Sequence, residues 1–244
     1  MPRHVPTRLA AACALALVLV LWAAVVAAAK SVPADLRVVV SGGKVLDEES
    51  LSTATTKVPT SPKARCFGNK SRGSGKAAKV SGPTAMGLLA QAAAGTSALR
   101  PFYVTDAFSF GLGLCTVGGY SATNRLSWYL KVNHKGAEVG GDSLKLKPGD
   151  EVLWALAAYP YPNELSLTGP SQATPGLPFQ VRVFSYDEGG KRRPVPGATV
   201  TAASGPTDSS GRAMVTLVGN EELRATHGKE IPSNALSVCV EICS

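Results

Sequence analysis

Only one stretch of this 244-residue chain has the periodicity of an α-helix, which restricts the fold to one built mostly of β-strands. The stretch covers residues 84–94, with Pro83 suited to its first turn and Gly95 suited to its end. Its apolar positions recur at spacings of three and four and form one stripe, made of Ala85, Leu88, Leu89, Ala92 and Ala93. Elsewhere short alternating runs are separated by glycine and proline, a pattern typical of strands and turns.

Residues 30–158 predict strands on both sides of this helix. Trp128, Leu130 and Val132 alternate with their neighbours and therefore fall on one face of a strand. The expected strands cover residues 36–40, 52–58, 126–132, 143–147 and 151–157. One helix packed across a mixed sheet is an α+β arrangement of the β-grasp kind, and we expect this fold for the first domain.

Residues 164–244 predict a second domain, an immunoglobulin-like β-sandwich. Its short strands, separated by turn residues, are expected at 165–167, 179–184, 199–203, 212–217, 223–226 and 236–240. The segment 159–163 is predicted to be the linker, because its two prolines cannot join a ladder of main-chain hydrogen bonds. We expect no large apolar contact between the domains at this polar junction.

Residues 1–29 have the pattern of a secretory signal peptide or a membrane anchor. A short basic start precedes an apolar run from Leu9 to Ala29, which ends in three alanines before Lys30. Small residues at that point suit signal peptidase, but the run is also long enough to span a bilayer uncleaved. Both alternatives predict that the rest of the chain is secreted or lies on the extracellular side of the membrane.

Beyond this segment the chain has four cysteines, an even number that predicts disulfide bonds in an exported protein. Three pairings are possible. We expect Cys66–Cys115 and Cys239–Cys243, because each pair then falls within one predicted domain. The sequence has no C-x2-C spacing, and its histidines have no partner at helical spacing, so we expect no metal site.

The formal net charge is +8, and basic residues concentrate in residues 63–79, which contain no acid. The cationic residues of this segment are Lys63, Arg65, Lys70, Arg72, Lys76 and Lys79. Their spacing among glycines and serines predicts a loop, tethered by Cys66. The loop is either a solvated segment or a contact for an anionic wall polymer or lipid surface. We expect no nucleic-acid partner, because no stretch interleaves basic and aromatic residues.

The sequence predicts no catalytic residue and no cofactor, and hence no enzyme. His134 and His227 lie in different predicted domains, and no G-x-S-x-G motif is present. Residues 111–115 lack the third glycine and the βαβ context of a nucleotide fingerprint and predict a turn before Cys115. The adjacent carboxylates of residues 47–49 are expected to be solvated.

Aromatic side chains are the best candidates for contact with a ligand. Trp128 and Trp154 lie in alternating strands, and we expect them in the core. The rings expected to be half exposed, and so available to stack on a planar or sugar ligand, are Tyr120, Tyr129, Tyr159 and Tyr161.

Four segments of the first domain resemble a bacterial domain of unknown function that is similar to the C-terminal domain of transcobalamin and intrinsic factor. They are residues 84–89, 118–120, 128–133 and 146–150. The resemblance implies a β-grasp-like fold and a tryptophan strand that ends in a Val-Asn-Gly turn, which is longer here. Together with the aromatic pattern, it makes four residues ligand-binding candidates: Tyr120, Trp128, Tyr129 and Asn133. In those carriers a helical barrel completes the cobalamin site, and this chain has one predicted helix, so we do not expect it to bind cobalamin alone.

Residues 194–200 and 207–213 are similar to bacterial immunoglobulin-like and carboxypeptidase-regulatory-like modules, which implies a spacer or adhesion role for the second domain. Two functions are therefore expected. The first is an exported, non-catalytic binding module for an unknown small ligand, held by the β-grasp-like domain. The alternative is a cell-surface structural or adhesion protein that contacts wall polymer or a partner protein. The oligomeric state stays open.

Overall fold

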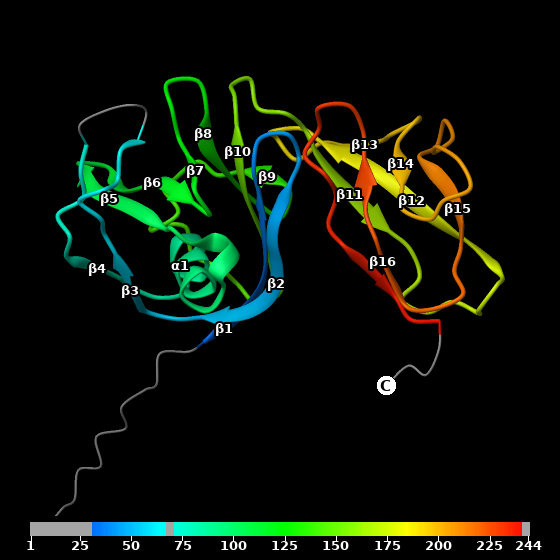
Figure 1. The fold of residues 1–244 in the computed structure, drawn as a ribbon, viewed down its shortest axis with the longest axis horizontal. Helices are drawn as coiled ribbons and strands as arrows, with labels where there is room; N and C mark the ends of the chain where they lie inside the picture. Colours follow the sequence, from blue (N-terminus) through cyan, green and yellow to red (C-terminus); the bar gives the residue numbers. More distant parts are fainter. Residues whose placement is uncertain (1–30, 67–70, 241–244) are drawn as a thin grey trace, which may run out of the picture.

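A computed structural model describes residues 31–66 and 71–240, which form two β-rich units (Figure 1). The predicted signal segment, residues 1–29, lies outside the described residues. In the part that the structure describes, no helix is long and apolar enough to span a bilayer. The prediction of a mostly β, α+β fold with one α-helix is confirmed.

The first unit is built on a five-stranded sheet with the strand order β2-β1-β10-β8-β9. The strands are β1 (Val32–Val39), β2 (Val45–Thr53), β8 (Ser127–Val132), β9 (Lys135–Gly136) and β10 (Asp150–Ala157). The first and last of them, β1 and β10, lie side by side and parallel, whereas the other pairs are antiparallel. A parallel central pair flanked by antiparallel strands, with one helix across the sheet, is the β-grasp arrangement.

Helix α1 (Ala85–Gly95) packs on one face of this sheet, which we call the helix face (Figure 1). The helix begins after Thr84, whose hydroxyl accepts a hydrogen bond from the main-chain N–H of Gly87 at 3.1 Å. Thr84 is therefore the N-cap, and Pro83 precedes the helix instead of entering its first turn. The helix and the helix face enclose the first core, which includes Leu36, Val38, Met86, Leu88, Leu89, Trp128, Leu130 and Trp154.

Two small sheets lie beside the helix, and the sequence predicted them poorly. One pairs β3 (Thr56–Pro59) with β4 (Ala77–Val80), so the strand expected at 52–58 is divided and the basic loop ends in a strand. The other joins β5 (Tyr103–Phe108), β6 (Gly111–Val117) and β7 (Tyr120–Ser121). The expected turn at 111–115 is therefore part of a strand. The strand expected at 143–147 is also wrong, because this segment makes only an isolated bridge from Lys145 to Thr84.

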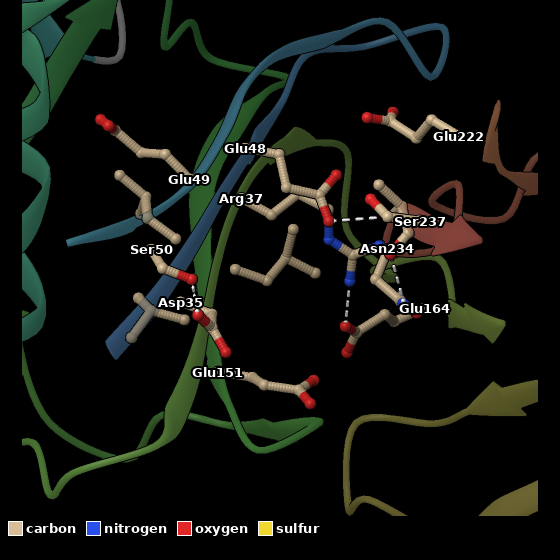
Figure 2. A pocket seen from close by; sticks show the side chains of 14 residues that line it. Asp35, Arg37, Glu48, Glu49, Ser50, Glu151, Glu164, Glu222, Asn234 and Ser237 are labelled. Atoms are coloured by element: carbon tan, nitrogen blue, oxygen red, sulfur yellow. Dashed lines mark hydrogen bonds and ion pairs between the residues drawn. The ribbon is translucent and has the colours of Figure 1, made fainter. Parts of the chain in front are cut away.

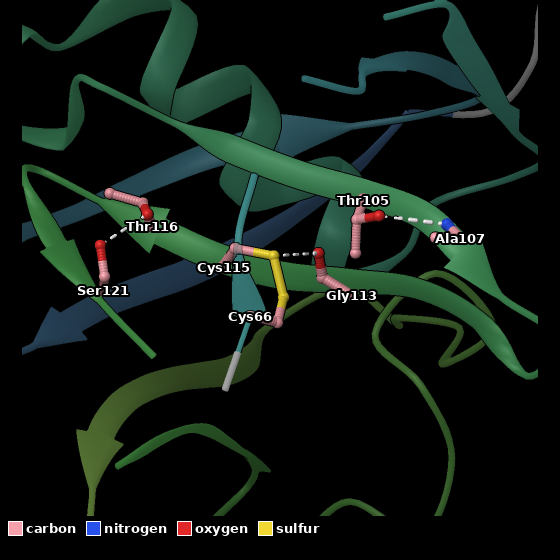
Figure 3. The surroundings of a disulfide bond; sticks show 7 residues. All are labelled: Cys66, Thr105, Ala107, Gly113, Cys115, Thr116 and Ser121. Carbon is pink, nitrogen blue, oxygen red and sulfur yellow. Dashed lines mark hydrogen bonds between the residues drawn. A yellow bond between two sulfur atoms is a disulfide. The ribbon is translucent and has the colours of Figure 1, made fainter. Parts of the chain in front are cut away.

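A disulfide bond joins Cys66 to Cys115, as predicted, and closes a loop with a sequence separation of 49 residues (Figure 3). Both cysteines are fully buried in a small cluster with Ala64, against which Tyr103 and Phe108 pack. The bond therefore fixes the start of the basic loop to β6. The second predicted bond, Cys239–Cys243, falls partly outside the described residues and stays a prediction.

The second unit is a small β-sandwich with its own hydrophobic core. One layer contains β11 (Glu164–Thr168), β12 (Pro178–Tyr186), β13 (Arg192–Pro194) and β15 (Arg212–Thr216). The other is made of two short pairs, β14 (Thr199–Val200) with β17 (Ala225–Thr226) and β16 (Glu221–Leu223) with β18 (Leu236–Val238). The core takes alternate residues from both layers, such as Leu165 and Val181 from one and Val200 and Leu223 from the other. The strand expected at 223–226 is divided, and β13 was not predicted.

The two units make direct contact, which the sequence did not predict. The second unit packs against the other face of the five-stranded sheet, which we call the junction face. Ile231 joins an apolar cluster there with Val39, Leu153 and Ala155. Neighbouring residues of a strand point to opposite faces of the sheet. The residues of β1 and β10 that alternate with those of the first core therefore supply this contact.

Candidate functional site

A pocket of about 310 Å³ lies beside residues 128–130 of strand β8, and residues of the first unit, the linker and the second unit line it. Six of its lining residues are aromatic, and we call it the aromatic pocket. They are Phe108 and Phe110 at the β5–β6 turn, Trp128 and Tyr129 on β8, Trp154 on β10, and Tyr161 in the linker. The second unit contributes Glu188. The volume is in the range typical of small-molecule sites.

The pocket has an exposed apolar rim and a buried aromatic floor. Phe110 is 74% exposed and Val139 is 53% exposed, so both offer apolar surface that a bound molecule could cover. Trp128 and Tyr129 on the floor are only 9% and 7% exposed. An apolar ligand would therefore remove the exposed rim from water and rest against rings that packing already holds in place.

Stacked rings fix the walls of the aromatic pocket. The rings of Tyr129 and Tyr161 lie 4.0 Å apart and nearly parallel, and the Tyr161 hydroxyl shares a 2.7 Å hydrogen bond with Ser127. The rings of Phe108 and Phe110 stack at 4.9 Å. Gly113 has no side chain, and this leaves room for the Phe108 ring beside β6. A Cβ atom at this position would lie 2.5 Å from the ring.

Two polar atoms of the pocket floor are buried without a hydrogen-bond partner among the described residues. They are Nε1 of Trp128 and the hydroxyl oxygen of Tyr129. The other indole of the pocket, Trp154, donates to the main-chain oxygen of Ala85 at 3.4 Å. Both atoms are enclosed by protein, so neither is open to a ligand in the pocket as the structure stands.

Of the four residues predicted to bind a ligand, the structure brings two together in the aromatic pocket, Trp128 and Tyr129. Tyr120 lies on β7, packs against the first core and does not line the pocket. Asn133 lies in the β8–β9 turn with a φ of 50°. Its side-chain amide bonds Asp150 at 2.8 Å and the main-chain N–H of Glu151 at 2.9 Å, so its amide fixes the turn to β10.

The predicted exposure of the aromatic residues is partly wrong. Trp128 and Trp154 are buried as expected, but Tyr129, expected to be half exposed, is buried, and the Tyr161 ring of the linker stacks on it. Tyr159 is 77% exposed. The sequence reasoning missed Phe108, Phe110, Val139 and Glu188. The pair of phenylalanines just before Gly111 was the one available signal, since large apolar residues at a turn seldom belong to the core.

A buried ionic network joins the two units beside the aromatic pocket. Glu164, the first residue of β11, pairs with Arg37 of β1, and its other oxygen lies 3.2 Å from Lys131 Nζ. His134 lies 3.2 Å from the same carboxylate and stacks on Tyr186 at 3.9 Å. Arg37, Lys131 and Glu164 are 6%, 1% and 2% exposed. The network thus fixes the second unit to the junction face of the sheet.

Burial and the neighbouring charges act in opposite directions on the pKa values of Glu164 and Lys131. Burial alone would raise the pKa of Glu164, but the hydrogen bond from His134 and the charges of Arg37 and Lys131 hold it below its ordinary value. Burial lowers the pKa of Lys131, and Glu164 opposes this shift only in part. Lys131 also donates to the main-chain oxygens of Tyr186 at 3.2 Å and Asp187 at 3.1 Å.

Carboxylates line a second pocket of about 360 Å³ between the units, shown in Figure 2. They are Asp35, Glu48, Glu49, Glu151, Glu164 and Glu222. Glu48 is not simply solvated as expected, because it bonds Arg224 at 2.7 Å and the main-chain N–H of Ala235 at 2.8 Å. Asp35 accepts from Ser50. Among the described residues no group of acids, histidines or cysteines is arranged to hold a metal ion, and we assign this pocket to the contact between the units.

Comparison with known proteins adds no assignment to this geometry. No protein-family model matches the chain, and no curated protein matches it. Both resemblances, to a bacterial domain similar to the transcobalamin C-terminal domain and to immunoglobulin-like modules, therefore stay predictions.

Proposed function

We propose that this chain is an exported binding protein that holds a small, largely apolar ligand in the aromatic pocket, without catalysis. The observation that carries the proposal is the exposed apolar rim, Phe110 and Val139, above a concave floor of buried aromatic rings. A concave, mostly apolar lining of this kind is typical of small-molecule sites.

Export is supported by the N-terminal pattern and by the Cys66–Cys115 bond, since structural disulfides persist in oxidising compartments. Binding without catalysis is supported by the residues of the pocket. Neither described histidine lines it, and its lining cysteine, Cys66, is held in the disulfide. Its polar groups are suited to orient a ligand and offer no nucleophile paired with a base.

The proposal is tested by titrating the protein with N-phenyl-1-naphthylamine, a neutral dye whose emission rises in apolar surroundings. The dye is expected to bind the wild-type protein and to be displaced by acetophenone, a smaller aromatic compound. Replacing the rim residues, Phe110→Ser and Val139→Ser, should weaken dye binding about tenfold or more, because the rim then no longer removes apolar surface from water.

Val218→Ser is the matched control. Val218 is also an exposed apolar residue, at 82%, but it lies in the second unit and does not line the pocket. Dye binding should be unchanged in this variant. Equal affinity in the wild type and the rim variant, or no binding at all, would exclude the aromatic pocket as the site.

A second candidate function is an electrostatic contact of the basic loop with an anionic polymer or lipid surface. Five of its six cationic residues are described, and all five are exposed: Lys63, Arg65, Arg72, Lys76 and Lys79. Lys70 lies outside the described residues. The exposed charges support this candidate, and its test is given in the Discussion.

A further inference from the structure

Strand β12 directs charged side chains to the outside of the second unit. Its residues Val181 and Val183 belong to the core of the sandwich. Since neighbouring residues of a strand point to opposite faces, Arg182 and Phe184 point away from this core. Arg212 of β15 is paired directly with Arg182, and paired residues project to the same face of a sheet.

A third arginine reaches the same surface from β13. Arg192 is paired with Tyr186, which lies on the same side of β12 as Phe184. The guanidinium carbon of Arg192 lies 4.4 Å from the centre of the Phe184 ring, and that of Arg182 lies 4.6 Å from it. Both cations therefore pack against one ring. We call the surface formed by Arg182, Phe184, Arg192 and Arg212 the arginine face.

The arginines of this surface have no acidic partner. Arg192 and Arg212 are exposed, and Arg182 is half-buried. Nε of Arg182 donates to the main-chain oxygen of Ser210 at 3.0 Å, which fixes the side chain and leaves its two terminal nitrogens for a further acceptor. None of the three forms an ion pair with a described residue, whereas the arginines at the contact between the units each pair with a glutamate.

The carboxylates near the arginine face do not neutralise it. Asp208 accepts hydrogen bonds from the main-chain N–H groups of Ser210 and Arg212 at 2.8 and 2.9 Å, so its side chain fixes its own turn. The main-chain bond from Arg212, followed by that from Ser210 and by the charges of Arg212 and Arg182, holds the pKa of Asp208 below its ordinary value. Glu164, on the same side of the sheet, belongs to the buried network. The surface therefore keeps a net positive charge, which attracts anions.

The make-up of the arginine face favours a charged polymer over a folded protein as its partner. Protein interfaces have an apolar centre, but the Phe184 ring is only 7% exposed, and two guanidinium groups pack against it. Met214, 42% exposed, adds one apolar side chain next along β15. The guanidinium groups come from three strands and so approach an anion from different directions. A tetrahedral phosphate accepts from such directions, whereas the two oxygens of a carboxylate lie in one plane.

We propose that the arginine face binds the phosphate groups of a linear anionic polymer. The inference goes beyond the function proposed above, because none of the residues of this surface lines the aromatic pocket. It also differs from the contact of the basic loop, since β12 and β15 lie at the end of the molecule opposite to β3 and β4 (Figure 1). The small ligand and the polymer thus occupy separate sites.

The test uses sodium polyphosphate as the probe and isothermal titration calorimetry as the measurement. The wild-type protein should bind polyphosphate, and its affinity should fall as salt is added, because salt screens exposed charges. A triple variant of the arginine face should bind at least about tenfold more weakly, because it loses three charge-assisted contacts. Its changes are Arg182→Gln, Arg192→Gln and Arg212→Gln. A control variant removes the same charge from exposed residues of the first unit and should keep the wild-type affinity. Its changes are Arg100→Gln, Arg125→Gln and Lys147→Gln.

Three results would overturn the proposal. The first is an affinity of the arginine-face variant equal to that of the wild type or of the control variant. The second is no binding of polyphosphate by the wild type. The third is equal binding of poly-L-glutamate and polyphosphate, which would indicate an acidic protein partner instead of a phosphate polymer. All three leave the binding of the dye to the aromatic pocket untouched, so they are distinct from a failure of the proposed function.

Spectra of the wild-type protein decide the question even if the triple variant does not fold. In ¹H–¹⁵N spectra, polyphosphate should shift the main-chain resonances of β12, β13 and β15. The Nε–H resonances of Arg182, Arg192 and Arg212 should move with them. Shifts confined to residues 63–79 would assign the polymer to the basic loop and contradict the proposal.

Discussion

Glu164 is the residue whose replacement tests the contact between the two units most directly. Its carboxylate lies at the centre of the buried network and faces Arg37 and Lys131. The change Glu164→Gln keeps the shape of the side chain and removes its charge. Two cations that are 6% and 1% exposed would then be buried without their counter-charge.

The expected loss of stability follows from the contacts that remain. Removing one partner of a buried ion pair costs about 3–5 kcal/mol, because the other charge stays buried and uncompensated. Here Arg37 keeps its bond to the main-chain oxygen of Pro232 at 2.5 Å, and Lys131 keeps two main-chain oxygens. We therefore expect the lower end, about 3 kcal/mol, which corresponds to a decrease in Tm of about 6–12 °C for a chain of this length.

The assay is differential scanning calorimetry of the wild type and the variant between pH 3 and pH 8. Because the pKa of Glu164 is lowered in the folded chain, the unfolded chain takes up this proton first as the pH falls. The stabilisation is therefore fully present above the ordinary value of 4.5 and is lost as the pH falls through the folded value. The difference in Tm between the two proteins should shrink below about pH 4.5 in the same way.

The matched control is Glu222→Gln. The Glu222 side chain is 60% exposed and pairs with Arg224 at 3.1 Å, so its replacement should leave Tm nearly unchanged. If E164Q unfolds at the temperature of the wild type, or if its deficit does not depend on pH, Glu164 does not hold the units together through its charge.

Three further predictions concern the rest of the chain. Replacing both Cys66 and Cys115 by Ser should destabilise the fold by about 4 kcal/mol, because the bond closes a loop with a separation of 49 residues. Urea unfolding with and without reductant measures this loss. A reductant effect that persists in the double variant would contradict the prediction. Thr84→Ala should cost about 1 kcal/mol through loss of the α1 N-cap, and Thr84→Ser should restore most of it, as judged by thermal melts. Replacing Arg72, Lys76 and Lys79 by Ser should weaken sedimentation with anionic vesicles, and salt should weaken the wild type likewise, because the Debye length falls from about 10 Å at 0.1 M to about 3 Å at 1 M. Salt-independent sedimentation would exclude the electrostatic contact.

The sequence predicted the elements whose signals are local. The stripe of α1 repeats every three to four residues, and Thr84 bonds to Gly87 only three positions away, so both are visible in one short window. Strand β8 was predicted within one residue because Trp128, Leu130 and Val132 alternate with their neighbours. Such patterns can be read from the sequence because the residues that form them pack along one continuous face of the helix or strand.

Elements that depend on distant partners were missed or misread. Strand β6 has glycines at positions 111 and 113, a composition that disfavours strands, and it forms because β5 and the disulfide hold it. Gly113 also makes room for the Phe108 ring, which is a contact that local sequence does not reveal. Segment 143–147 alternates like a strand, but the sheet has no open partner there beyond one bridge to Thr84.

Half of the predicted ligand-binding residues lie in the candidate site, and their signal is local to one strand. Trp128 and Tyr129 were identified as aromatic residues of one strand, but the other residues of the pocket come from distant parts of the chain, such as segments 108–114 and 137–141 and Glu188. Arg37 and Lys131 interrupt apolar strands, and the sequence analysis assigned them no role. Both pair with Glu164 of the second unit, a contact between residues that are far apart in the sequence.

The alternation of strand β8 explains why the pocket and the contact between the units occur together. Trp128 points to the helix face and forms the pocket floor, whereas Tyr129 and Lys131 point to the junction face. Lys131 bonds the main chain of Tyr186 and Asp187, and the next residue, Glu188, bonds Gly136 through its main-chain oxygen at 2.9 Å and lines the pocket. The second unit therefore contributes Glu188 to the lining of the candidate site, and the bonds that fix the unit to the sheet also position this residue.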